Sequence, residues 1–104
     1  MEKAFNALSE TTRLELFLII NAIPNVCLCN LEDCFNLSVS NLSRHLKELD
    51  SVGLISSCKK SKWKYYSVTE YGQTFITFIN SIIDEPTKAK LELSLKLLEG
   101  VKQC

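Results

Sequence analysis

The sequence predicts a mainly helical fold with one small β-hairpin. Leucine, isoleucine and phenylalanine recur at helical spacing along several stretches, which is the pattern of helices that bury one face. Two stretches with β-branched and aromatic residues, 54–59 and 63–68, flank a short polar segment and indicate a hairpin. The 104 residues contain only three glycines and two prolines, as expected of a compact, helix-rich chain. We assign residues 1–104 to a single domain.

The N-terminal part of the chain is expected to hold two helices. Residues 3–8 make a short helix, and Ser9 with Thr12 begins a second one. The second helix is apolar nearly all round through Ile20, so it should lie at the centre of the core. Pro24 and Asn25 follow this helix and should end it.

Two short helices joined by a tight turn are expected next. Residues 26–29 should be extended, with Asn30 as the N-cap of a third helix over residues 31–35. Ser38 is placed to cap a fourth helix, whose leucines all fall on one inward face. These leucines are Leu42, Leu46 and Leu49. Two such helices, the second with a polar and basic free face, are typical of a helix-turn-helix unit.

The free face of the fourth helix carries the residues that we expect to read DNA. In a helix-turn-helix unit the N-terminal part of the second helix meets base edges. The base contacts are therefore assigned to Ser40, Asn41, Ser43 and Arg44. Arg44 is the best candidate for specificity, because arginine can hold guanine O6 and N7 with two hydrogen bonds. Lys47 should contact a phosphate, and His45 should pack inward with a structural role.

The charge distribution also points to a nucleic-acid partner. The net charge is zero, but residues 41–67 contain six lysine or arginine residues and two acidic ones, which gives this segment a charge of +4. Four of these lysines surround the turn of the expected hairpin: Lys59, Lys60, Lys62 and Lys64. Such clustering is expected of a surface that contacts phosphates. The lysine cluster therefore argues against a helix-turn-helix domain that contacts only other proteins.

The C-terminal third is expected to contain two helices and a dimer interface. Thr69 should cap a fifth helix with Phe75, Phe78, Ile79 and Ile82 at helical spacing, and Pro86 should mark its end. A last helix over residues 87–102 has a broad leucine stripe: Leu91, Leu93, Leu95, Leu97 and Leu98. One small domain offers too little surface to cover this stripe. The pattern therefore predicts a homodimer held by the first and last helices.

The five cysteines favour ligand chemistry over a disulfide framework. Their number is odd, and neither a signal peptide nor a membrane-spanning stretch is evident, so we expect a cytoplasmic protein with free thiols and no membrane partner. In an extended segment, Cys27 and Cys29 would project to the same side with α-carbons about 6.6 Å apart. Two thiolates there could close on one soft ion. Cys34 is either a third ligand or a buried structural thiol, and Cys58 should pack.

An enzyme is not expected. The chain has no Cys-x-x-Cys redox motif and no glycine-rich phosphate loop, and its single histidine lies in the expected DNA-reading helix. These features disfavour a thiol enzyme or a metal carrier, and no organic cofactor is expected.

Several segments together resemble the ArsR/SmtB family of bacterial repressors that sense metals and metalloids. The segments are residues 8–14, 26–31, 38–46, 53–55 and 62–66, and they include Ser-Arg-His-Leu at 43–46 and Lys-Trp-x-x-Tyr at 62–66. The resemblance covers residues 5–80 and keeps its spacing without a gap. It implies a winged helix-turn-helix homodimer that holds a palindromic DNA operator and releases it when an inducer binds.

The resemblance also implies an inducer class. Members with Cys-x-Cys at this position are typically sensors of arsenite and antimonite, or of cadmium and lead, which makes Cys27 and Cys29 the ligands. The chain departs from the arsenite pattern at Glu32, where a third cysteine would complete Cys-x-Cys-x-x-Cys. The candidates for the third sulfur ligand, in order of preference, are Cys34, Cys104 of either subunit and a small-molecule thiol. A redox or persulfide sensor that uses Cys34 with Cys104 is the alternative on the same scaffold.

Overall fold

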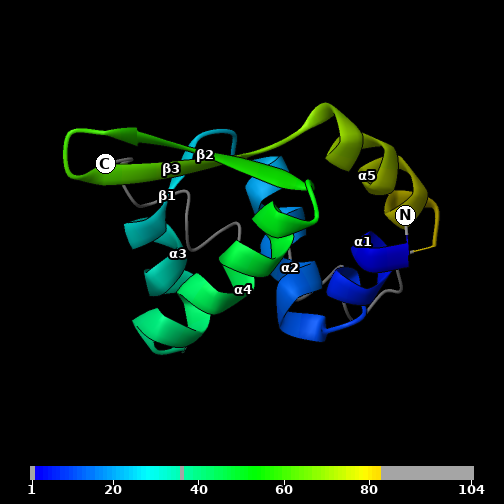
Figure 1. Ribbon diagram of the computed structural model, residues 1–104, viewed down its shortest axis with the longest axis horizontal. Helices are drawn as coiled ribbons and strands as arrows, with labels where there is room; N and C mark the ends of the chain where they lie inside the picture. The colour runs from blue at the N-terminus through cyan, green and yellow to red at the C-terminus, as the bar shows by residue number, and fades with distance from the viewer. Residues whose placement is uncertain (1, 36, 83–104) are drawn as a thin grey trace.

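The structure of the protein is a computed structural model that describes residues 2–35 and 37–82 (Figure 1). The elements are α1 Glu2–Leu8, α2 Thr11–Ala22, β1 Val26–Cys27, α3 Leu28–Cys34, α4 Val39–Ser51, β2 Ile55–Lys60, β3 Trp63–Val68 and α5 Glu70–Ile82. The predicted mainly helical fold with a small β-hairpin is confirmed. The expected helix over residues 87–102 and the expected helix end at Pro86 lie outside the described residues.

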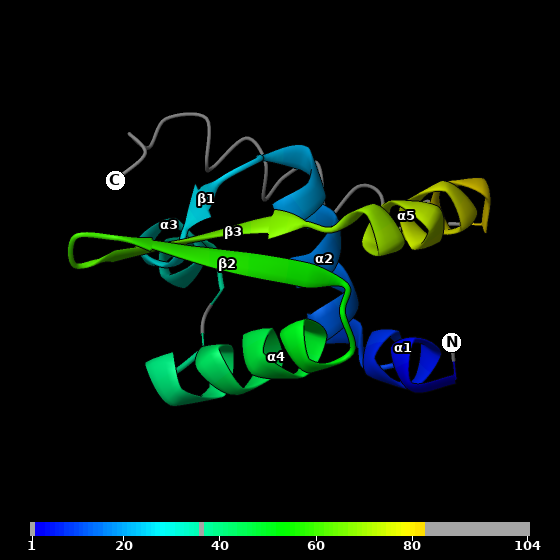
Figure 2. The same cartoon turned by 45° about the horizontal axis from the view of Figure 1, so that its top comes forward.

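Helix α2 forms the centre of the core, as its apolar sequence predicts. Leu16, Phe17, Ile19 and Ile20 each expose no more than 1% of their surface. Helices α2, α3 and α4 lie on one side of the sheet, and α1 and α5 lie together at the end opposite the hairpin turn (Figures 1 and 2). None of the described helices combines the length and the apolar content needed to cross a bilayer.

The start of α2 differs from the expectation. Glu10 is the N-cap residue, and its side chain accepts a hydrogen bond from the backbone N–H of Arg13 at 3.0 Å. The Ser9 hydroxyl instead donates to the carbonyl of Asn6 at 2.7 Å, at the end of α1. A carboxylate at this place satisfies a free N–H group and interacts favourably with the positive end of the helix.

The start of α3 also differs from the expectation, and this changes the geometry of the cysteines. Residues 26–29 are not extended throughout, because only Val26 and Cys27 pair with β3. Helix α3 begins at Leu28 with Cys27 as its N-cap, so Cys29 is already helical. Asn30 is not the N-cap but a residue inside the helix that is 3% exposed. Asn25, with φ of 60°, provides the turn between α2 and β1.

Both ends of α4 are fixed by local hydrogen bonds. The Ser38 side chain caps the first turn by accepting from the N–H of Asn41 at 3.2 Å, as predicted. At the other end, Gly53 has φ of 83°, and its N–H donates to the carbonyl of Asp50 at 3.0 Å. The N–H of Leu54 donates to the carbonyl of Leu49 at 3.1 Å. This pair of bonds is the Schellman motif, which favours glycine at the left-handed position.

The three strands form one antiparallel sheet in the order β1-β3-β2. The hairpin pairs Ile55 with Val68 at its base and Lys60 with Trp63 at its tip. Ser61 has φ of 59° in the turn. The predicted strands, 54–59 and 63–68, are confirmed with a shift of one residue in the first.

Helix α5 begins where the hairpin returns to the core. The Thr69 hydroxyl accepts from the N–H of Gly72 at 3.0 Å, which confirms the predicted cap, and it donates to the carbonyl of Gly53 at 2.6 Å. The helix passes so close to the chain at Leu54 that only glycine fits at position 72. A β-carbon there would contact the carbonyl oxygen of Leu54 and would lie 2.7 Å from Cγ1 of Val68.

Gly72→Ala should therefore destabilise the fold. Alanine favours a helix over glycine by about 1 kcal/mol, but this gain is smaller than the cost of forcing α5 away from Leu54. We expect a net loss of about 1–3 kcal/mol in the free energy of unfolding, measured by urea denaturation. Asn80→Ala, on the exposed face of the same helix, should change this free energy by no more than about 0.5 kcal/mol. Equal stability of Gly72→Ala and the parent protein would contradict the close approach.

Candidate functional site

The predicted outward face of α4 is confirmed. Its inward leucines, Leu42, Leu46 and Leu49, expose no more than 1% of their surface. The residues assigned to DNA are all exposed: Ser40, Asn41, Ser43, Arg44 and Lys47. The face is therefore rigidly supported from below and free above, which is what a recognition helix needs.

His45 belongs to the packed side of α4 and not to this face. It is 8% exposed, and its Nδ1 lies 3.7 Å from Oε2 of Glu10 without a hydrogen-bond partner among the described residues. Burial lowers the pKa of His45 below its ordinary value, and the carboxylate of Glu10 opposes this shift only in part. A neutral histidine that packs α4 against the start of α2 agrees with the structural role expected for it.

The hairpin turn carries the predicted lysines on its surface. Lys59, Lys60, Lys62 and Lys64 are all exposed. The Lys62 ammonium lies 5.2 Å from the centre of the Trp63 ring, so part of the tip is held by a cation–π contact. The turn and the N-terminal end of α4 project toward the same end of the molecule (Figure 2). We call the exposed basic residues of these two elements the basic face: Arg44, Lys47, Lys59, Lys60, Lys62 and Lys64.

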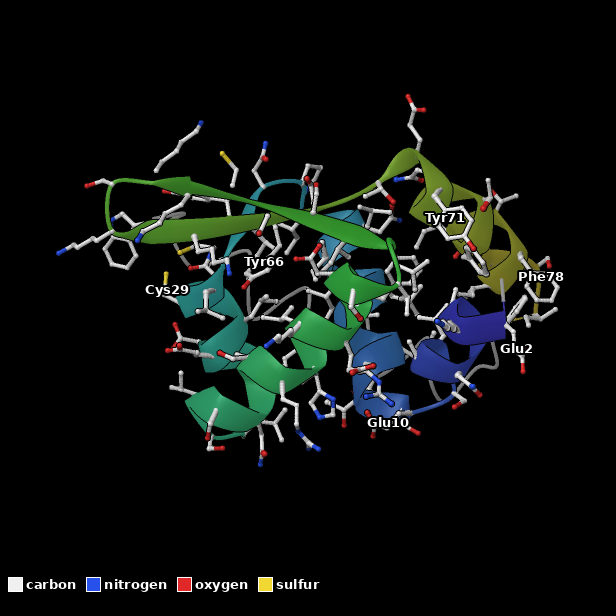
Figure 3. The ribbon with its side chains drawn as sticks, viewed as in Figure 1. Glu2, Glu10, Cys29, Tyr66, Tyr71 and Phe78 are labelled. Carbon is white, nitrogen blue, oxygen red and sulfur yellow. The ribbon has the colours of Figure 1, made fainter. Side chains whose placement is uncertain are left out.

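The structure brings Cys27 and Cys29 together at the start of α3. Their Sγ atoms lie 2.8 Å apart, although one residue belongs to β1 and the other to α3. Cys27 is a free thiol with no exposed surface. Cys29 is partly buried, at the end of α3 nearest the sheet (Figure 3). The expected extended pair is wrong in its geometry, but the helical turn at Leu28 brings the two sulfurs into contact.

The described residues provide two sulfur ligands for a soft ion and no third. No group of three histidine, cysteine, aspartate or glutamate side chains suited to a metal occurs among the described residues. The side chain of Cys34 and the whole of Cys104 lie outside the described residues, and their roles stay predictions. Cys29 is disulfide-bonded in this structure, so a site that uses both sulfurs requires reduced protein.

Cys58 is an exposed free thiol, and the expectation that it packs is wrong. The reason is that it lies on the sheet face that the described helices leave open.

A cavity of about 360 Å³ lies between the start of α3, α4 and β3. Leu28, Leu46 and Tyr66 contribute apolar surface to it, and the polar groups at its edge come from Ser43, Lys47, Asp50 and Lys64. This cavity could not be predicted from the sequence, because its walls come from three separated segments. The contributions of Leu28, Asp50 and Tyr66 had no recognisable signal in the sequence.

A supported recognition helix beside a lysine-rich hairpin defines a winged helix-turn-helix protein of the transcription-regulator class. Comparison with known proteins places the chain within this class. Residues 11–57 match the bacterial regulatory protein arsR family. The chain belongs to the arsR family, whose members matched here are transcriptional regulators and not enzymes.

Individual relatives agree with this assignment. The chain is 30% identical over 88 residues to an arsenical resistance operon repressor of Escherichia coli, which covers 85% of this chain and 73% of that protein. It is 29% identical over 68 residues to a CadC homologue of Staphylococcus aureus, a cadmium resistance transcriptional regulatory protein. The matched residues make up 65% of this chain and 56% of that protein. HlyU of Vibrio cholerae has the same fold, with a TM-score of 0.70 at 21% identity over 78% of this chain and 88% of that one.

Proposed function

We propose that the protein is a repressor that binds operator DNA as a homodimer and releases it when arsenite or antimonite binds Cys27 and Cys29. The observation that carries the proposal is the contact of the two sulfurs, 2.8 Å apart, at the first turn of the helix that precedes the recognition helix. The name of the E. coli relative, an arsenical resistance operon repressor, supports the choice of inducer.

The basic face is the proposed DNA surface. Ser40, Asn41, Ser43 and Arg44 would meet base edges in the major groove, because they lie in the N-terminal half of α4. Lys47 and the hairpin lysines, Lys59, Lys60, Lys62 and Lys64, would contact phosphates. Phosphate contacts set the position of the protein on the duplex, while the base contacts select the sequence.

The two sulfurs suit a soft inducer. Thiolates favour soft ions over magnesium or calcium. In a tetrahedral zinc site, with zinc–sulfur bonds of about 2.3 Å, two sulfurs lie about 3.8 Å apart. For an ion of similar bond length, the pair observed at 2.8 Å would have to open by no more than about 1 Å. We propose Cys34 as the third ligand, before Cys104 of either subunit or a small-molecule thiol.

Release of DNA would follow from a change at the start of α3. Only four residues separate α3 from α4, so a new geometry at Cys27 and Cys29 would alter the position of α4. A dimer reads two half-sites one helical turn apart, and a changed spacing between its two recognition helices would fit the operator poorly. A coupling free energy of about 1–3 kcal/mol is enough to lower operator affinity 5- to 150-fold.

We expect the homodimer to use α1 and α5 together with the C-terminal segment. Phe5, Tyr71, Phe78 and Ile82 expose between 43 and 63% of their surface. Helices α1 and α5, which carry them, lie together at one end of the molecule, where Figure 3 shows Tyr71 and Phe78. Phe5 also packs edge-on against Phe75 and Phe78, which fixes α1 beside α5. Sedimentation at micromolar concentration should give a dimer. Ile82→Glu should weaken this dimer, and Asn80→Glu on the same helix should not. If the parent protein is a monomer, the model of a dimer with two recognition helices on two half-sites is wrong.

A mobility-shift assay with the DNA upstream of the protein's own gene tests the proposed function. Reduced protein should retard this DNA, the binding should weaken as salt is raised, and arsenite should release it. Absence of retardation at low salt would reject DNA binding. Retained complex at saturating arsenite and antimonite would reject the inducer.

Two further inducer classes have support. The CadC homologue is named for cadmium resistance, which supports cadmium or lead as the alternative inducer. If these ions release the DNA and arsenite and antimonite do not, the inducer belongs to this second class. The disulfide at Cys29 favours a redox-responsive repressor. In that case a thiol oxidant would release the DNA without any metal, and dithiothreitol would restore binding.

A further inference from the structure

The cavity between α3, α4 and β3 lies within the basic face. The floor of the cavity is formed by the buried side chains of Leu46 and Tyr66, which expose only 1% and 5% of their surface and are largely apolar. Its edge is polar, since Ser43, Lys47, Asp50 and Lys64 are exposed. Two separate elements, α4 and the hairpin, therefore each contribute one lysine to the same small space.

We propose that this cavity seats one phosphate group of the operator backbone, held jointly by Lys47 and Lys64, and that Leu28 transmits inducer binding to this seat. The inference rests on the proposed function and goes beyond it in two ways. It assigns two lysines to a single phosphate, and it identifies the physical link between the inducer site and the DNA.

The direction of Lys64 supports the joint contact. Side chains alternate between the two faces of a strand, so Lys64 and Tyr66 share a face of β3. Tyr66 is buried against the helices, and the Lys64 ammonium lies 5.7 Å from the centre of its ring. Lys64 is thus held on the side of the sheet that faces α4. Lys60 differs, because it pairs with Trp63 and lies on the opposite face of the hairpin.

The charge of the cavity indicates which form of phosphate it accepts. Lys47 and Lys64 contribute two positive charges, and Asp50 contributes one negative charge at the same edge. Burial, together with the charge of Asp50, raises the pKa of Tyr66, so its phenol stays neutral. A net charge of one positive unit matches a singly charged phosphodiester better than doubly charged free phosphate. We therefore expect DNA, and not inorganic phosphate, to occupy the seat.

Leu28 connects this seat to the inducer site. It is the residue between Cys27 and Cys29, it is the first residue of α3, and its side chain lines the cavity. An inducer that holds the sulfurs on either side of Leu28 must move Leu28 with them. The wall of the seat then shifts against Leu46 and Lys47 of the recognition helix.

A double-mutant cycle tests the shared phosphate. Lys47→Gln and Lys64→Gln should each weaken operator binding, and the double variant should lose less than the product of the two effects. The salt slope of the double variant should fall by about 0.9 in total, the value for one phosphate contact. For comparison, the effects of Lys47→Gln and Lys60→Gln should multiply. The shared phosphate seat would be overturned if either single variant kept the operator affinity of the parent. It would also be overturned if the losses of affinity of the two single variants multiplied in the double variant. Displacement of DNA by 10 mM inorganic phosphate beyond the effect of ionic strength would overturn its selectivity.

The role of Leu28 is tested by linkage. The operator affinity of Leu28→Ala is measured without and with saturating arsenite, and arsenite should lower this affinity by a much smaller factor than in the parent. Leu14→Ala removes a comparably part-buried leucine from α2 and should keep the full response. Equal responses of Leu28→Ala and the parent would overturn the link while leaving the proposed function intact. If the parent itself does not respond to arsenite, the proposed function fails, and the lysine cycle still decides the seat.

Discussion

Replacing both Cys27 and Cys29 by serine should leave operator binding intact and abolish its release by arsenite. Serine preserves the size of cysteine but is a poor ligand for a soft ion. Neither residue belongs to the basic face, so DNA affinity should stay within about threefold of the parent. The parent should lose about 5- to 150-fold of its operator affinity at saturating arsenite, and the variant should lose none. A mobility-shift titration of reduced protein measures both quantities.

Controls separate the loss of sensing from the loss of folding. Cys27 has no exposed surface, so a hydroxyl there can cost about 1–3 kcal/mol of stability. Cys29→Ser alone changes only the more accessible sulfur and should also abolish the response. Cys58→Ser removes an exposed thiol on the open face of the sheet and should keep the full response. If the double variant still releases DNA on addition of arsenite, antimonite, cadmium or lead, this pair of sulfurs is not the sensor.

The sequence was most informative where structure depends on near neighbours. Ser38 and Thr69 cap their helices through residues three positions away, and such bonds follow from local pattern alone. The leucine face of α4 follows from helical periodicity in the same way. The outward orientation of Arg44 could therefore be predicted without knowledge of the rest of the chain.

Prediction failed where a residue's conformation depends on a distant partner. The two-residue strand β1 exists because β3, far along the chain, pairs with Val26 and Cys27. That pairing ends at Cys27, and this is why α3 starts at Leu28. The cavity has the same origin, because Leu28, Lys47 and Lys64 meet only in the folded chain. Cys58 was misjudged because the sequence does not show which face of the hairpin the helices cover.

Arg44→Ala should remove most of the discrimination between the operator and unrelated DNA without unfolding the protein. Arg44 is exposed on a helix held from below by Leu42 and Leu46, so its loss leaves the core unchanged. A bidentate contact with guanine contributes about 1–3 kcal/mol of discrimination against the wrong base. The ratio of affinities for operator and scrambled DNA should therefore fall by about 5- to 150-fold, with an unchanged thermal midpoint of unfolding.

Comparison with Lys47→Ala distinguishes a base contact from a phosphate contact. A phosphate contact carries no sequence information, so Lys47→Ala should weaken binding to operator and scrambled DNA alike and reduce the salt slope by at most about 0.9. Arg44→Ala should instead act mainly on the operator. If Arg44→Ala lowers both affinities equally, Arg44 contacts the backbone, and base selection must be assigned to Ser40, Asn41 and Ser43. If neither affinity changes, α4 does not enter the major groove as proposed.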